Sequence, residues 1–246
     1  MNDTYLITGA SSDLAIAYLK MLSDRGDNCT ALCQYHTHHD ALDDLIKQSD
    51  CLNIVTYSVD LSNSDMTEKW IREIEASGYE PNHILHAAAE PFSYMYIKDF
   101  NWEKTLKQLT IQVNSFGQIM KAFLPKMSKQ KYGKVVAILS AGILGVAPRY
   151  MSDYIIAKQA LYGLVKSTAV EYAEKGININ AISPNMMETK FLKNLEPRQV
   201  DIAAKGTTLK RNVRVEEVVK TIDYLMSDAS DYMTGVNINI TGGDSM

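Results

Sequence analysis

Tyr154 and Lys158 are four residues apart in a segment with helical periodicity, so their side chains lie on one face of the predicted helix. A lysine ammonium beside a tyrosine hydroxyl favours the phenolate and lowers the pKa of the tyrosine. Such a tyrosine can exchange a proton with a carbonyl or alcohol oxygen. The Tyr-x-x-x-Lys pattern also arises by chance on surface helices, so the pair by itself leaves both interpretations open.

Two further polar residues have positions that suit a site. Ser140 ends the apolar run "VVAILS", where its hydroxyl could hydrogen-bond a reacting oxygen or simply end a strand. Asn114 lies inside a long helical pattern, although Asn is a poor helix former. There it binds the backbone or a water molecule, or it is incidental.

The stretch "TGASSDLA" (8–15) joins a short apolar run to a helical pattern. A glycine-containing turn that opens a helix presents backbone N–H groups and a positive helix end, which together bind a pyrophosphate. The same residues would also suit an ordinary loop between a strand and a helix.

Strand-like and helix-like segments alternate along the chain, which predicts a parallel sheet with helices on both faces and ligands beyond the carboxyl ends of its strands. The expected strands are 5–8, 29–35, 53–61, 83–89, 133–141, 177–183 and 235–243. The expected helices are 14–26, 39–49 with Asp40 as its cap, 64–78, 101–127 with a possible break near Pro125, 153–176 and 214–228.

Composition excludes several classes of protein. Hydrophobic residues make up 46% and charged residues 22%, as in globular domains, and the net charge of −4 does not favour a nucleic-acid partner. The three cysteines have no metal-ligand spacing and indicate free thiols in a reducing compartment. No apolar run is long enough for a membrane span, and the first strand leaves no room for a signal peptide. We therefore expect a soluble cytoplasmic protein that does not contact a membrane.

Taken in order, these features resemble the short-chain dehydrogenase/reductase family over residues 4–243. The segments "DYIIAKQAL" and "INAISPNMMETKF" are most similar to its 3-oxoacyl-[acyl-carrier-protein] reductase-like branch. The resemblance implies one doubly wound Rossmann domain over 1–246 with about seven parallel strands. It also implies a substrate lid at about 189–213, and a homotetramer that uses helices 101–127 and 153–176.

The resemblance assigns roles to individual residues. Tyr154 would be the proton donor, Lys158 would lower its pKa and hold the nicotinamide ribose, Ser140 would orient the substrate carbonyl, and Asn114 would hold a water molecule in the proton relay. The implied cofactor contacts are Gly9, Ser11, Ser12, Asp13, Leu14, Tyr35, His36, Thr37, Asp60, Leu61, Ala87, Ala88, Tyr154, Lys158, Pro184, Met187 and Thr189.

The chain departs from the family pattern at three places. Asp13 and Ala15 replace the second and third glycines of the turn, and His86-Ala87-Ala88-Ala89 stands where the family has Asn-Asn-Ala-Gly. After the sixth strand Pro184-Asn185 stands where the family has Pro-Gly, and Asn tolerates a positive φ better than most residues. The carboxylate of Asp13 either repels a pyrophosphate or points away from it, where the positive helix end stabilises it. The loss of the Asn side chain removes an amide that supports the site.

The sequence favours NADP(H) over NAD(H). An NAD site needs an acidic residue at the end of the second strand, and neither Asp nor Glu occurs between Cys29 and His39. His36 and Thr37 could donate to a 2′-phosphate there. The position that decides the preference is either Cys33 or Tyr35.

The predicted activity is the NADP(H)-dependent interconversion of a ketone and a secondary alcohol. The substrate is a β-ketoacyl thioester, a sugar-derived ketone or another small carbonyl compound. A lysine patch of Lys126, Lys129, Lys131 and Lys134 is either a solvated helix end or a docking site for an acyl-carrier protein. The stretch "HTHHD" (36–40) is interpreted as a solvated loop, and no metal is expected. The alternative is a cofactor-sensing or scaffolding protein.

Overall fold

The computed structural model describes residues 3–91, 94–192 and 194–244. Its described strands form one sheet of seven parallel strands in the order β3-β2-β1-β4-β5-β6-β7. The strand order changes direction between β1 and β4, and this topological switch point is where α/β sheets bind ligands. The strands are β1 (Thr4–Thr8), β2 (Cys29–Tyr35), β3 (Leu52–Ser58), β4 (His83–His86), β5 (Gly133–Ile138), β6 (Ile177–Pro184) and β7 (Asn237–Ile240).

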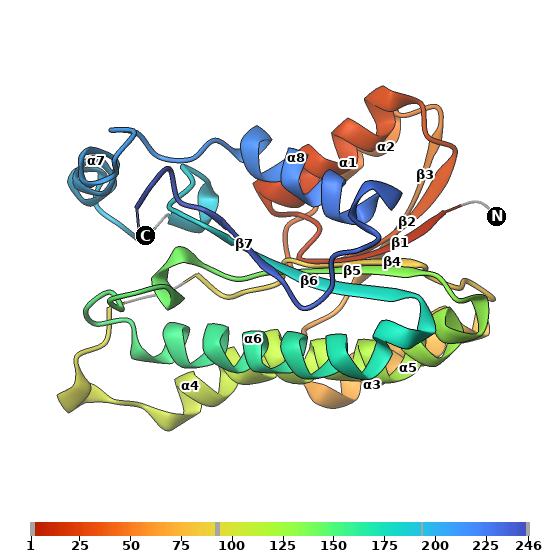
Figure 1. Cartoon of the computed structure of the whole chain (residues 1–246), viewed down its shortest axis with the longest axis horizontal. Helices are drawn as coiled ribbons and strands as arrows, with labels where there is room; N and C mark the ends of the chain where they lie inside the picture. The colour runs from red at the N-terminus through yellow and green to blue at the C-terminus, as the bar shows by residue number, and fades with distance from the viewer. Residues whose placement is uncertain (1–2, 92–93, 193, 245–246) are drawn as a thin grey trace.

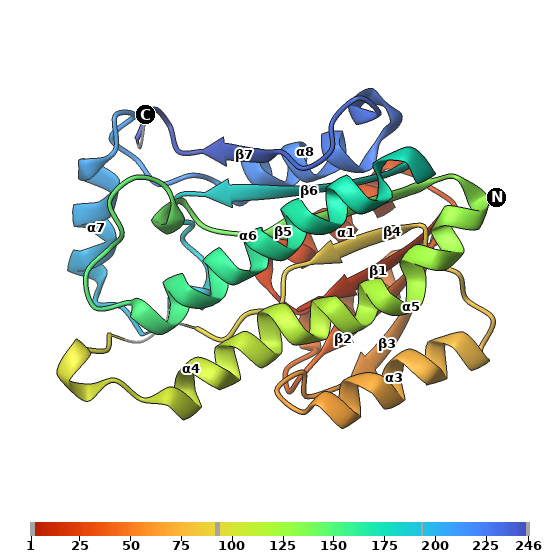
Figure 2. The ribbon, with the colours of Figure 1, turned by 60° about the horizontal axis from the view of Figure 1, so that its bottom comes forward.

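Helices cover both faces of the sheet (Figure 1), so the predicted doubly wound fold is confirmed. One face packs against α1 (Asp13–Arg25), α2 (Asp40–Gln48) and α8 (Val215–Met226). The other packs against α3 (Ser64–Ala76), α4 (Trp102–Leu109), α5 (Ser115–Gln130) and α6 (Ser152–Tyr172). Helix α7 (Pro197–Gly206) lies beyond the carboxyl ends of the strands (Figure 2). Short 3-10 turns span Ile97–Asp99, Ala141–Ile143, Ala173–Lys175, Lys190–Leu192 and Asp228–Ser230.

The strands are apolar because helices shield both of their sides. Every residue of β5 is buried, as is every residue of β4. Two clusters of buried side chains, one on each face of the sheet, form the core. Among the residues that the structure describes, no helix is both long and apolar enough to cross a membrane.

Several predicted strands end earlier than the sequence pattern indicated. Strand β4 stops at His86 instead of residue 89, and β5 stops at Ile138 instead of residue 141. Apolar residues continue past these ends because they line a cleft rather than pair in the sheet. At α2 the expected cap was wrong: His39 is the residue before the helix, and Asp40 is its first residue.

The long helical pattern after residue 101 is interrupted at a different place from the one predicted. Pro125 lies inside α5, which continues to Gln130. Because Pro125 faces solvent, water can satisfy the carbonyl group that loses its helical partner. The interruption is instead a π-helical turn over Thr110–Asn114, which separates α4 from α5. Such widened turns occur often at functional sites.

The segment 189–213 contains a helix that the sequence analysis did not predict. Helix α7 begins at Pro197, and the Gln199 side chain accepts a hydrogen bond from the backbone N–H of Glu196 at 3.0 Å. A proline in the first turn and a side chain that bonds back to the cap are helix-start signals. The stretch "EPRQ" therefore carried a local signal for this helix.

Candidate active site

A cleft of about 1490 Å³ opens at the carboxyl ends of the strands. It gathers the turn after β1, the ends of β2, β4, β5 and β6, the start of α6, and the segment 189–213. Two predicted site residues, Tyr35 and Asn114, are not among the residues that line it. The predicted residues that do line it are Gly9, Ser11, Ser12, Asp13, Leu14, His36, Thr37, Asp60, Leu61, Ala87, Ala88, Ser140, Tyr154, Lys158, Pro184, Met187 and Thr189.

The turn after β1 depends on Gly9. Its φ of +64° suits glycine, and an added Cβ atom would lie 2.9 Å from the backbone of Ala88. The backbone N–H of Gly9 donates to the Gln34 side chain at 2.8 Å, and Ser12 caps α1 by accepting from the N–H of Ala15 at 3.3 Å. This places the positive end of a helix dipole in the cleft, and that arrangement fits the pyrophosphate of a dinucleotide.

Asp13, the acidic residue of this turn, is hydrogen-bonded to the segment 189–213. One carboxylate oxygen accepts a hydrogen bond from the backbone N–H of Lys190 at 2.7 Å. The carboxylate therefore connects the start of α1 to the far wall of the cleft. Ala15, the other departure from the family turn, is fully buried and fits the contact between helix and sheet.

Tyr154 and Ser140 both line the cleft. Tyr154 is in the first turn of α6 and Ser140 follows β5, and hydrogen bonding with Ser140 acts to lower the pKa of Tyr154. Ser140 is held in place because its hydroxyl also accepts from the backbone N–H of Gly142 at 3.1 Å. Only 6% of Tyr154 is exposed, and Phe191 from the opposite wall lies 6.3 Å away, ring centroid to ring centroid.

Lys158 is one helical turn after Tyr154 and is 3% exposed. Its ammonium group donates to the carbonyl of Ile138 at 2.6 Å and lies 5.7 Å from the centroid of the Tyr154 ring. Burial lowers the pKa of Lys158 to about 7. The lysine is therefore poised to change its charge near neutral pH.

The expected direction of the Tyr154 pKa was wrong for the protein without ligand. Burial raises this pKa above its ordinary value, and the hydrogen bond with Ser140 only partly offsets that effect. The physical reason is that removal from water penalises the phenolate. The phenol consequently stays protonated at neutral pH.

Asn114 does not reach the cleft. It is exposed, and its amide donates to the hydroxyl of Ser64 on α3 at 3.1 Å. Gln112, two residues earlier in the same π-helical turn, is fully buried, and its amide donates to Gln108 at 2.7 Å. Its side-chain oxygen is buried and has no hydrogen-bond partner among the residues that the structure describes. The π-helical turn thus directs Gln112, rather than Asn114, toward the interior.

The end of β2 forms a different surface from the one expected. Cys33 is fully buried, and Tyr35 is not among the residues that line the cleft. The side chains that line this part are Gln34, His36, Thr37, His38 and Asp40. Gln34, His36 and Thr37 were among the candidates expected at the end of this strand, whereas His38 and Asp40 were not expected to line the cleft.

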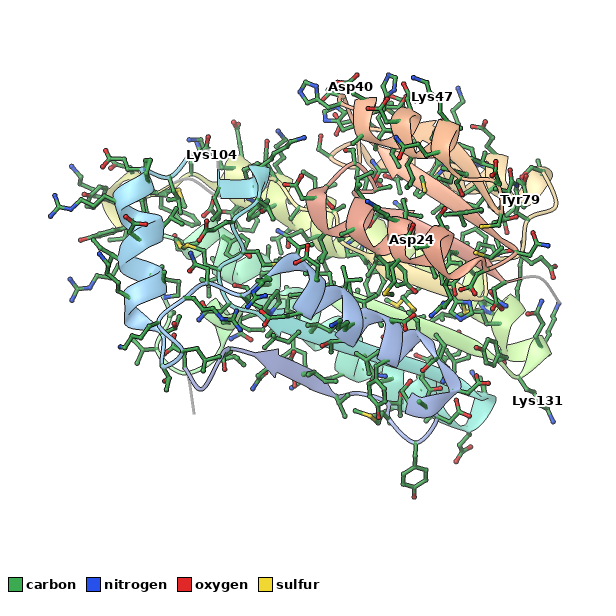
Figure 3. The ribbon with its side chains drawn as sticks, turned by 90° about the horizontal axis from the view of Figure 1, so that it is seen from above. Asp24, Asp40, Lys47, Tyr79, Lys104 and Lys131 are labelled. Atoms are coloured by element: carbon green, nitrogen blue, oxygen red, sulfur yellow. The ribbon has the colours of Figure 1, made fainter. Side chains whose placement is uncertain are left out.

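The lysine patch lies at the wrong end of the sheet for a role at the cleft. Lys131 follows the last residue of α5, at the end of the molecule away from α7 (Figure 3). Lys134 is 1% exposed and pairs with Asp231 at 2.5 Å, and Lys126 pairs with Glu75 at 3.1 Å. Ion pairs thus engage two of the four lysines, and the position of the patch away from the cleft favours the interpretation as a solvated helix end.

Aromatic residues surround the mouth of the cleft. The rings of Tyr96 and Tyr150 lie 4.4 Å apart, and Tyr94 packs edge-on against Tyr150. The carbonyl of Tyr150, whose φ is +64°, accepts from the N–H of Met95 at 2.8 Å. Arg149 lines the cleft beside them. The mouth is therefore largely apolar, with a cation at its rim.

A parallel sheet with this cleft, and a Ser, Tyr and Lys set inside it, define an oxidoreductase of the Rossmann type. The sequence profile of the family described as enoyl-(acyl carrier protein) reductase matches residues 9–245. The chain therefore belongs to the short-chain dehydrogenase/reductase family, whose members bind nicotinamide cofactors.

Relatives with assigned names span nearly the whole chain. A 3-oxoacyl-[acyl-carrier-protein] reductase from Buchnera aphidicola subsp. Schizaphis graminum is 28% identical over 98% of this chain and 96% of the relative. An acetoacetyl-CoA reductase from Allochromatium vinosum is 23% identical, covering 97% and 96%. The solved structure of a 3-oxoacyl-(acyl-carrier-protein) reductase from Agrobacterium tumefaciens C58 with NADP bound has a TM-score of 0.86 at 23% identity, covering 98% and 93%.

Proposed function

We propose that the protein is an NADP(H)-dependent oxidoreductase that interconverts a ketone and a secondary alcohol, with Tyr154 as its proton donor. The observation that carries this proposal is that the side chains of Tyr154 and Ser140 line the same cleft, beside the buried ammonium group of Lys158. A carbonyl oxygen that reaches these two hydroxyls receives one hydrogen bond for orientation and one proton for reaction.

The residues of this chain act on the proton and on the orientation of the substrate. The raised pKa of Tyr154 keeps its phenol protonated, which is the form that reduction requires. When Lys158 holds its own proton, the phenolate left after transfer is stabilised by the adjacent positive charge. A bound nicotinamide supplies the hydride, which no side chain provides. In our proposal Gln112 replaces Asn114 in the proton relay, because its side chain is buried behind the cleft and its oxygen has no donor among the described residues, although like Asn114 it does not line the cleft itself.

Substitution of Tyr154 tests this mechanism. Tyr154→Phe should lower turnover by about 10² to 10⁴-fold, because it removes the transferred proton and little else. The dissociation constant for NADPH should stay within about twofold of the wild-type value, because loss of the Tyr154 hydroxyl group removes at most one weak hydrogen bond to the cofactor. Tyr162→Phe, on the same helix but outside the cleft, is the matched control. A fully active Tyr154→Phe enzyme would rule the mechanism out.

The preference for NADP(H) rests on the end of β2. His36, Thr37 and His38 line the cleft there and can donate to a 2′-phosphate, whereas Asp40 opposes it. The Agrobacterium relative binds NADP, which supports the same preference. Calorimetric titration with NADPH and NADH tests it directly. Tighter NADH binding would reverse the assignment, and no binding of either would favour the cofactor-independent scaffold.

We propose a β-ketoacyl thioester as the substrate, with a sugar-derived or other small carbonyl compound as the alternative. The names of the Buchnera and Allochromatium relatives support a thioester, and so does the apolar, aromatic mouth of the cleft. If an acyl-carrier protein delivers the substrate, the cation available at the mouth is Arg149. Arg149→Glu should then weaken activity on a carrier-bound substrate far more than on a small ketone, and an equal loss on both would count against carrier delivery.

The proposal includes a cytoplasmic homotetramer with a mobile lid at 189–213. Trp102 on α4 and Val170 on α6 are 57% and 81% exposed, and burial against another subunit would remove this apolar surface from water. Light scattering on the purified protein measures the assembly. Trp102→Lys should dissociate a tetramer that uses this face.

A further inference from the structure

His86, the last residue of β4, is buried behind the cleft and contacts two separate elements, the end of β1 and the π-helical turn. Its imidazole is 1% exposed and lies 2.8 Å from the Thr8 hydroxyl through Nδ1 and 2.9 Å from the Gln112 carbonyl through Nε2. Its ring stacks on Phe116 with centroids 4.6 Å apart. Thr8 directly precedes the turn that faces the dinucleotide, and Gln112 lies in the π-helical turn.

The chemistry of the partners sets the direction of each hydrogen bond. A carbonyl oxygen only accepts, so the proton of the neutral ring lies on Nε2 and is donated to Gln112. Nδ1 then accepts from the hydroxyl of Thr8. The same hydroxyl oxygen accepts from the backbone N–H of Ala88 at 3.3 Å. The bonds form one continuous series in which each described donor has an acceptor.

The imidazole stays neutral across the working range of pH. Burial and the nearby positive charge of Lys158 lower the pKa of His86 to about 3. The connection from Thr8 through His86 to Gln112 therefore does not change when Lys158 loses or gains its proton.

We propose that His86 is a positioning residue that joins the dinucleotide-facing turn to the helix segment carrying Gln112. This corrects the expectation that the departure from Asn-Asn-Ala-Gly removes support from the site, because an imidazole reaches both partners. The inference rests on the proposed function, since it assigns Gln112 to the same reaction. It predicts that each bond supports a different step: the Thr8 bond supports cofactor binding, and the Gln112 bond supports turnover.

A second histidine in the same strand provides a matched control. His83, at the opposite end of β4, is also buried, and it lies 2.8 Å from the Asn82 side chain and 3.1 Å from the Met226 carbonyl. Its ring stacks on Tyr5 with centroids 4.5 Å apart. His83 thus has the same kind of contacts as His86, but it lies at the end of β4 away from the cleft and contacts neither Thr8 nor the π-helical turn.

The test compares His86→Gln, His86→Asn, His86→Phe and His83→Phe. Gln keeps a donor near the position of Nε2, so His86→Gln should raise the NADPH dissociation constant about tenfold with little change in kcat. Asn keeps an acceptor near Nδ1, so His86→Asn should lower kcat about tenfold with little change in NADPH binding. His86→Phe should both raise the NADPH dissociation constant and lower kcat. His83→Phe should lower only the melting temperature.

Hydrogen exchange of the segment 108–116 in the protein without cofactor gives a readout that needs no activity. His86→Asn should speed exchange there, and His86→Gln should leave it close to wild type. The opposite effects of His86→Gln and His86→Asn on NADPH binding and kcat test the inference even if His86→Phe does not fold. If the wild-type protein binds neither NADPH nor NADH, the proposed function fails. Hydrogen exchange then still tests whether His86 connects Thr8 to the π-helical turn. Variants of His86 that change only the melting temperature, as at His83, would overturn the inference.

Discussion

Each end of the sheet holds a buried lysine, and the two lysines differ in the groups that their ammonium groups contact. Lys134, at the amino end of β5, donates to Asp231 at 2.5 Å and to Asn178 at 3.0 Å. Lys158, beyond the carboxyl end of the same strand, donates to the carbonyl of Ile138, and within the described residues no ion pair joins it. Both are almost completely withdrawn from water.

The difference shows how a buried charge can be structural at one place and reactive at another. A carboxylate partner compensates the cost of burying Lys134, and the two hydrogen bonds of this lysine tie β5 to β6 and to the loop before β7. Lys158 has no such compensation, which is why burial lowers its pKa to about 7. Its charge remains available to a ligand or to Tyr154.

The largest expected effect comes from replacing each lysine with methionine. Lys158→Met should lower turnover by about 10² to 10⁴-fold, because it removes the charge beside Tyr154. Lys134→Met should leave turnover within about twofold, since Lys134 is far from the cleft. Steady-state kinetics on the two purified variants measures the contrast. Equal losses at both positions would mean that the comparison reflects folding and not chemistry.

The second prediction concerns the dependence of stability on pH. The unfolded chain keeps the Lys158 proton up to about pH 10, whereas the folded chain releases it near pH 7. The unfolded state therefore binds more protons in this window, and stability rises with pH across it. The cost of burying the charge is fully present below about pH 7. Denaturant unfolding should show Lys158→Met more stable than wild type there.

The difference in unfolding free energy between Lys158→Met and the wild-type protein should then shrink by about 1.4 kcal/mol per pH unit as the pH rises from 7 toward 10. Asn114→Ala, an exposed change on another helix, is the control and should show no such trend against wild type. A gap that stays constant across this range would show that Lys158 keeps its proton when buried.

A smaller effect distinguishes two residues of the π-helical turn. Gln112→Leu should lower kcat about tenfold, because it removes the buried amide that faces the interior. Asn114→Ala should leave kcat within about twofold, since its amide contacts only Ser64. Parallel measurement of kcat and melting temperature separates a local effect from lost stability. The reverse order of effects would restore Asn114 to the proton relay.

The smallest expected effect is at Asp13. Asp13→Asn keeps a side-chain oxygen for the N–H of Lys190 and removes the charge, so NADPH should bind about two- to fivefold more tightly at low salt. Asp13→Gly also removes the bond to the segment 189–213, which should become more susceptible to limited proteolysis. Calorimetry and a protease time course measure the two outcomes. Unchanged affinity in both variants would show that the carboxylate is too far from the phosphates to matter.

Local patterns predicted much of the fold and part of the candidate site. The order and type of the strands followed from apolar runs, because a sheet covered on both faces needs apolar side chains on both. Tyr154 and Lys158 share a helix face through their spacing alone, and Gly9 was recognisable because a tight turn there requires a residue that tolerates positive φ. These features depend on neighbours in the chain.

Other features depended on contacts between distant segments. Side chains two positions apart on a helix are rotated by about 200°, so Gln112 and Asn114 point to nearly opposite sides. Which of the two faces inward depends on how α4 and α5 pack. The bond between Thr8 and His86 joins residues 78 positions apart, and the bond between Asp13 and Lys190 joins residues 177 apart. No local pattern encodes such pairs.

The sequence by itself determined the alternation of strands and helices, the glycine turn and the spacing of Tyr154 and Lys158, because each is decided within a few residues. Only the tertiary structure decided the charge behaviour of Lys158, the raised pKa of Tyr154, the isolation of the lysine patch and the double contact of His86. The physical reason is that the energy of a charge or a hydrogen bond depends on how deeply the group is buried and on which groups it contacts. Burial and contacts are both properties of the packed molecule.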